Sequence, residues 1–133
     1  MMQMKTLVLA GAAVAGAIAL GAATRPAALN PASGGLWEVT GLPGARGAFA
    51  ECVADPMVLA QFEHRGKTCT RIVISDQGNA AVIEYSCPGG GFGRSKVTVI
   101  TPRSLRIETQ GISDKLPFNY VLQARRVGNC PGK

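Results

Sequence analysis

The sequence predicts a mainly β protein, an antiparallel meander of about seven strands curled into a half-open barrel or a sandwich. One short helix, two disulfides and an N-terminal signal segment complete this prediction. Short β-branched or apolar segments recur between turns rich in Gly and Pro, and one segment begins with residues typical of a helix start. Four cysteines follow an apolar leader, and the short connections favour sequential antiparallel pairing.

Residues 1–23 have the features of a secretory signal peptide. Lys5 precedes an apolar run rich in Ala and Gly, and Gly21 and Ala23 are the small residues expected before a cleavage site. The run is weakly hydrophobic and only just long enough to cross a bilayer, so we expect no stable transmembrane anchor. The predicted organisation is a signal peptide at 1–23, a flexible lead-in at 24–34 and a single β-rich domain at 35–130, in a periplasmic or secreted protein.

The first half of the domain is predicted to contain two strands and the helix. Residues 36–40 form the first strand, and their Trp37 is expected to anchor the core. A weaker strand is expected at residues 45–53. The helix, at residues 56–63, has Asp55 as its N-cap and a proline at its first position.

A hairpin follows, with strands at residues 71–75 and 80–85 around turn residues 76–79. If paired residues have numbers that sum to 156, Cys69 faces Cys87 and the hairpin closes with a three-residue loop. A flexible, glycine-rich loop is expected at residues 88–95. Further strands are expected at residues 96–101, 105–109 and 118–125, with turns at 102–104 and 111–115.

The four cysteines of this exported chain predict two disulfides. Zinc binding is disfavoured, because there is no Cys-x-x-Cys pair and His64 is the only histidine. Three pairings are open to four cysteines. We predict Cys69–Cys87 from the hairpin register and Cys52–Cys130 partly by elimination, because the second bond ties the strand before the helix to the end of the last strand.

Several segments together resemble bacterial domain-of-unknown-function family 3617, a group of small exported proteins. They are GLWEVT at 35–40, Cys52 before an acidic-Pro helix entry, a cysteine on each side of an apolar hairpin, and RVGNC at 126–130. The resemblance covers nearly all of residues 34–130. This chain is similar to a short version of the family, since members often have a longer segment between the first strand and the first cysteine. The resemblance implies no known activity.

The sequence contains no recognisable catalytic residue, and we expect no metal and no cofactor. His64 lies beside Arg65 and Lys67, a cationic neighbourhood that disfavours the protonated imidazole, and is expected to be a solvated histidine at the helix end. No Gly-x-Ser-x-Gly elbow is present, and the carboxylates are scattered rather than clustered.

The formal net charge of +6 is the one charge signal in the sequence. A solvated basic surface would explain it, but it also suggests attraction to anionic envelope components, with contacts at Arg94, Lys96, Arg103 and Arg106. Nucleic acid is disfavoured as a partner, because the chain is exported and has too few aromatic residues for a stacking platform.

Two classes of function therefore remain. The first is a non-catalytic module that binds an envelope ligand or a periplasmic protein partner. The alternatives are a hydrolase or isomerase whose site is not visible in the sequence, and an inhibitor of an envelope hydrolase. A polar cleft that holds His64 and a carboxylate would favour an enzyme, whereas an apolar cavity or a protruding loop at 88–95 would favour a binding module.

We predict cleavage after Ala23 during export. Mass spectrometry of protein from a periplasmic fraction should find Thr24 at the N-terminus. Recovery of the chain with Met1 intact in the membrane fraction would contradict this prediction.

Overall fold

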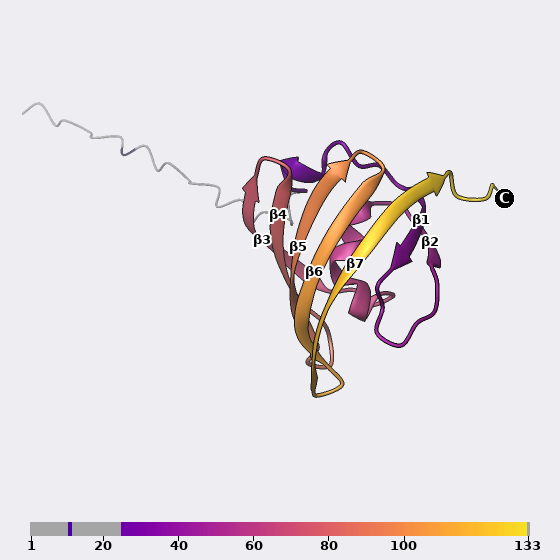
Figure 1. Ribbon diagram of the computed structural model, residues 1–133. Coiled ribbons are helices and arrows are strands. Elements are labelled where there is room, and N and C mark those ends of the chain that lie inside the picture. The colour runs from indigo at the N-terminus through magenta and orange to yellow at the C-terminus, as the bar shows by residue number, and fades with distance from the viewer. Residues whose placement is uncertain (1–10, 12–24, 133) are drawn as a thin grey trace, which may run out of the picture.

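The computed structural model describes Gly11 and residues 25–132 (Figure 1). The predicted signal peptide therefore lies, apart from Gly11, outside the described residues. Among the residues that are described, no helix is long and apolar enough to cross a membrane.

Seven antiparallel strands form one open sheet, in the order β2-β1-β7-β6-β5-β4-β3 (Figure 1). Strands β3 to β7 are a meander, and the β1–β2 hairpin extends the sheet beyond β7. The predicted mainly β fold, with seven antiparallel strands, one short helical segment and two disulfides, is confirmed. The strands are β1 (Gly35–Thr40), β2 (Phe49–Val53), β3 (Thr70–Gln77), β4 (Ala80–Ser86), β5 (Phe92–Thr101), β6 (Ser104–Ser113) and β7 (Leu116–Gly128).

The β3–β4 hairpin keeps the predicted register only near the cysteines. Arg71 pairs with Tyr85 and Val73 with Ile83, as predicted, but the register then shifts between Val73 and Ser75. Because of this irregularity Gln77 pairs with Ala80, and the hairpin closes with two residues, not the predicted three. The loop is Gly78-Asn79, and Gly78 has the positive φ (60°) that such tight turns require.

Strands β5, β6 and β7 are longer than the sequence predicted. β5 begins at Phe92, so the predicted flexible loop at 88–95 is only a short turn before that residue. β6 continues to Ser113, so the predicted turn at 111–115 shrinks to Asp114 and Lys115, both with positive φ. Continuous pairing with neighbouring strands overrides the weak strand propensity of the glycines, which had indicated loops.

The predicted helix is a kinked 3₁₀ segment, η2 (Pro56–His64), which packs on one face of the sheet. It begins as predicted, because the Asp55 side chain accepts a hydrogen bond from the Met57 N–H at 3.0 Å. Ser95 on β5 donates to the Ala60 carbonyl at 2.5 Å, which fastens η2 to the sheet. We call the face under η2 the inner face and the opposite one the outer face.

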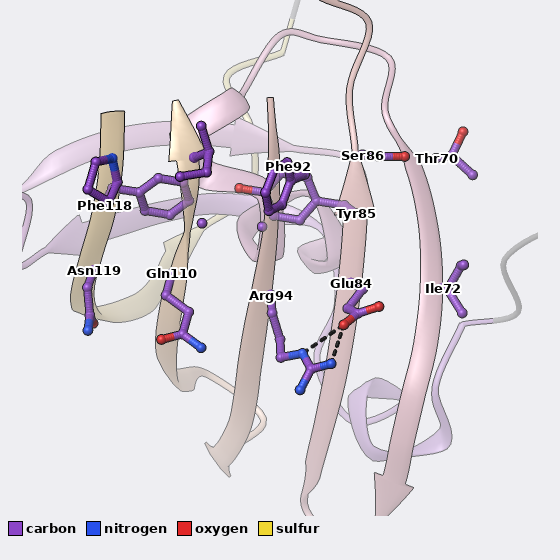
Figure 2. Close-up of a pocket in the computed structure, with 14 residues that line it drawn as sticks. Thr70, Ile72, Glu84, Tyr85, Ser86, Phe92, Arg94, Gln110, Phe118 and Asn119 are labelled. Atoms are coloured by element: carbon purple, nitrogen blue, oxygen red, sulfur yellow. Dashed lines mark hydrogen bonds and ion pairs between the residues drawn. The ribbon is translucent and has the colours of Figure 1, made fainter. Parts of the chain in front are cut away.

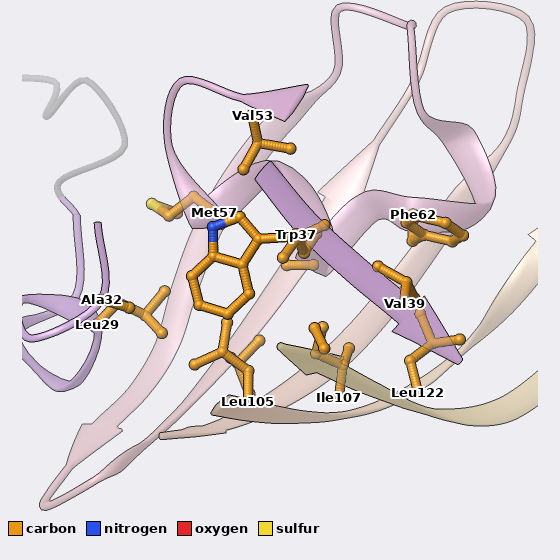
Figure 3. Close-up of a cluster of buried hydrophobic side chains, with 14 of the residues drawn as sticks. Leu29, Ala32, Trp37, Val39, Val53, Met57, Phe62, Leu105, Ile107 and Leu122 are labelled. Atoms are coloured by element: carbon orange, nitrogen blue, oxygen red, sulfur yellow. The ribbon is translucent and has the colours of Figure 1, made fainter. Parts of the chain in front are cut away.

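The core lies between η2 and the inner face, with Trp37 at its centre (Figure 3). Trp37 is fully buried, as predicted, and its indole N–H donates to the Ser33 carbonyl at 3.1 Å. Leu105, Ile107 and Leu122 are also fully buried, because the period-two alternation of β6 and β7 directs them to the same side.

Part of the expected flexible lead-in belongs to this core. Residues 27–29 form a 3₁₀ turn, η1 (Ala27–Leu29), and Leu29 is fully buried. The Asp76 carboxylate accepts from the Ala27 and Ala28 N–H groups at 2.7 and 2.9 Å. Arg25 forms an ion pair with Asp55 at 2.6 Å. The packed domain therefore begins before residue 35.

The structure contains the disulfides Cys52–Cys130 and Cys69–Cys87, which are the predicted pairs. The Cα atoms are 5.5 Å apart in the first and 4.2 Å apart in the second. Cys69–Cys87 fastens the open end of the β3–β4 hairpin. Cys52–Cys130 joins the edge strand β2 to the segment after β7 and links residues 78 positions apart in the sequence.

Loss of Cys52–Cys130 should destabilise the domain more than loss of Cys69–Cys87. The longer loop restricts the unfolded chain more, with loop-entropy estimates of about 4.5 and 3 kcal/mol respectively. Paired Cys→Ser variants, C52S/C130S and C69S/C87S, compared by urea unfolding, test this ranking. An equal or reversed loss of unfolding free energy would show that loop entropy does not determine the ranking.

Candidate functional site

The outer face carries an open hollow with a volume of about 730 Å³, where β3 to β7 run side by side (Figure 2). We call it the outer hollow. Its size falls within the range of small-molecule pockets, about 300 to 1,000 Å³. The residues that line it are Thr70, Ile72, Glu84, Tyr85, Ser86, Phe92, Gly93, Arg94, Gln110, Gly111, Ile112, Pro117, Phe118 and Asn119.

Two facing glycines form the floor of the outer hollow. Gly93 on β5 pairs with Gly111 on β6, between Tyr85 on β4 and Phe118 on β7. A Cβ on Gly93 would lie 2.6 Å from the Tyr85 ring, and one on Gly111 would lie 2.9 Å from the Phe118 ring. The two rings therefore cover the glycines and leave no room for a side chain at either position.

One rim of the hollow is apolar. Phe92 pairs with Ile112, which pairs with Pro117, so three apolar residues form a row across β5, β6 and β7. Phe92 is 50% exposed, and Ile72 on β3 is 58% exposed. Since outer-face residues of a one-sided antiparallel sheet are normally polar, this apolar rim departs from the usual pattern.

The next row of the outer face is polar. Glu84, Arg94, Gln110 and Asn119 pair successively across β4 to β7 (Figure 2). The Arg94 guanidinium donates two hydrogen bonds to the Glu84 carboxylate. The two amides provide both donors and acceptors, so this row can orient a polar group beside an apolar one.

His64 is buried, and the prediction of a solvated histidine is wrong. It is 3% exposed, because η2 directs its ring into the core and not into solvent. Its Nδ1 lies 2.9 Å from the Tyr85 hydroxyl, and its ring meets Tyr85 and Phe118 edge to face. A Cβ on Gly91 would overlap the His64 ring, so the turn before β5 packs directly on the histidine.

Glu63 and two tyrosines lie beside this histidine. The Tyr120 hydroxyl donates to the Glu63 carboxylate at 2.6 Å. Burial, together with the Glu63 charge, raises the pKa of Tyr85 to about 12, although a hydrogen bond with Thr109 opposes the shift. Burial and the hydrogen bond to Glu63 raise the pKa of Tyr120 still further. Both phenols therefore keep their protons to a higher pH than an ordinary tyrosine does.

Three of the four predicted anion contacts share the outer face. Arg94 and Lys96 lie on β5, in the sheet and not in the predicted loop, and Arg106 lies on β6. Arg94 is paired with Glu84, and Arg106 with Glu108 at 3.6 Å. Arg103 is separate, in the β5–β6 turn. The predicted basic residues therefore form no continuous unpaired patch.

The hollow is mainly apolar, while the only histidine lies on the other side of its glycine floor. The Glu84 carboxylate is held by Arg94. Within residues 25–132, no three His, Cys, Asp or Glu residues are placed to hold a metal ion.

Of the residues that line the hollow, the sequence predicted only Arg94 as a site residue. Gly93 lies in the predicted flexible loop at 88–95 and Gly111 in the predicted turn at 111–115, so Phe92, Ile112 and Pro117 have no predicted strand position. Burial alternates with period two through Gly93 on β5, but on β6 the alternation ends at Gln110. The sequence carries no polar–apolar alternation at these positions, because Phe92 and Ile112 are apolar residues on the outer face.

Comparisons of the chain with protein-family models, with curated proteins and with solved structures found no match.

Both tyrosines should resist ionisation in the folded protein. In the unfolded chain they ionise near pH 10. Because the folded state keeps phenol protons that the unfolded state loses between pH 10 and 12, the free energy of unfolding should fall as the pH rises through that window. Tyrosinate absorbance of the folded protein checks this, with urea-denatured protein as the control. Ionisation of both phenols near pH 10 without unfolding would contradict it.

Proposed function

We propose that this protein is a non-catalytic binding domain of the periplasm or cell exterior, and that its outer hollow receives the apolar part of an envelope ligand. The observation that carries the proposal is the hollow itself. The backbone at Gly93 and Gly111 forms its floor, and one rim carries the exposed apolar side chain of Phe92. Exposed apolar surface of this kind is costly unless a ligand covers it.

The position of His64 supports binding over hydrolysis or isomerisation. A general base must reach a bound substrate, but this imidazole is enclosed by Tyr85, Phe118 and Gly91. Of the two features expected of a binding module, the apolar cavity is supported by the outer hollow, whereas residues 88–91 form a short turn packed on His64 and no protruding loop.

The two disulfides support the proposed location, because such bonds persist in oxidising compartments outside the cytoplasm. Membership of bacterial domain-of-unknown-function family 3617 is likewise a proposal, supported by the order of the four cysteines and by the GLWEVT and RVGNC segments.

Phe92→Ala should weaken binding of an uncharged apolar dye, N-phenyl-1-naphthylamine, by roughly fivefold, because a truncated aromatic anchor typically costs 1 kcal/mol or more. Ile100→Ala is the matched control, since Ile100 is a large apolar residue on the same strand, 58% exposed and outside the hollow. Fluorescence titration measures the affinity, and thermal melts establish that both variants fold. Equal affinities of the two variants, or no dye binding by the unmodified protein, would refute the proposal.

A further inference from the structure

A second, smaller hollow of about 420 Å³ adjoins the outer hollow on the same face. The two hollows share the polar residues Arg94, Gln110 and Asn119, which lie at the boundary between them. The second hollow extends along β5 and β6 to Lys96 and Glu108, with Val82 and Val121 at its sides. One ligand can therefore occupy both hollows, with an apolar part in the first and a polar part in the second.

The charges in the second hollow favour an anionic polar part. Arg94 forms an ion pair with Glu84. Glu108 lies opposite Lys96 on the neighbouring strand, but its carboxylate forms an ion pair with Arg106 instead. Lys96 is exposed and makes no ion pair with any of the described residues. An exposed ammonium beside two amide side chains can bind a carboxylate or a phosphate.

The same ion pairs argue against an extended polyanion. A polymer would need a series of unpaired cations along the sheet, but Arg94, Arg106 and Arg125 each face a glutamate. A single anionic group next to a single apolar group matches the two adjoining hollows.

We propose that the ligand is a single-chain anionic amphiphile, with its hydrocarbon chain in the outer hollow and its acidic head group at Lys96. This inference rests on the proposed binding function. The apolar rim formed by Phe92, Ile112 and Pro117 covers the chain, while Gln110 and Asn119 donate to the head group beside the ammonium. Carboxylate and phosphate head groups share this chemistry, and direct comparison of the two identifies the preferred one.

The test uses four probes below their micelle concentrations, measured by calorimetry on the purified protein. They are dodecanoate, dodecyl phosphate, an uncharged dodecyl maltoside and inorganic phosphate. We expect both anionic amphiphiles to bind about three- to tenfold more tightly than the uncharged one, as expected for one charge-assisted contact. Inorganic phosphate, which lacks a chain, should not bind measurably.

Lys96→Gln should reduce the affinity for the anionic amphiphiles to that for the uncharged one. Arg103→Gln is the control, because it removes the same charge from the β5–β6 turn, outside both hollows. If Lys96→Gln leaves the affinity for the anionic amphiphiles unchanged, or if Arg103→Gln lowers that affinity equally, the head-group assignment is wrong. In that case, a loss of affinity in Phe92→Ala would still support binding at the outer hollow. If no amphiphile and no dye binds, the proposed function fails as well.

Discussion

The constraint on which this structure depends is that a single open sheet has only one face to bury. Each of β4 to β7 must present its apolar residues to η2 and Trp37, and the period-two alternation then places every other residue on the outer face. A shift by one residue would exchange the two faces. The buried row therefore also determines which residues can form the outer hollow, and Phe92 lies outside because Gly93 lies inside.

The glycine pair connects the core with the candidate site. With no side chain at Gly93 and Gly111, the Tyr85 and Phe118 rings lie against the backbone and thereby fill the inner face at that level. His64, the last residue of η2, packs on both rings and so connects them to η2. The outer side of the same backbone lines the outer hollow. One pair of residues therefore contacts the aromatic rings on one side and lines the hollow on the other.

A domain of this size has a small core, and covalent bonds supplement it. Cys52–Cys130 holds β2, a five-residue edge strand, against the end of the chain, and Cys69–Cys87 holds the hairpin at the opposite edge. The outer face can then keep exposed apolar residues without loss of the fold. The core and the disulfides stabilise the sheet from its inner face and its edges.

Local signals in the sequence determined the mainly β class, the seven strands, the start of η2 at Asp55 and the buried position of Trp37. Alternation, turn residues and capping act over a few positions, so they can be read from the chain directly. Only the tertiary structure decided the burial of His64, the pairing of β1 with β7 and the outer hollow. Each depends on contacts between residues distant in sequence, and a glycine in a strand carries no local mark that separates it from a glycine in a turn.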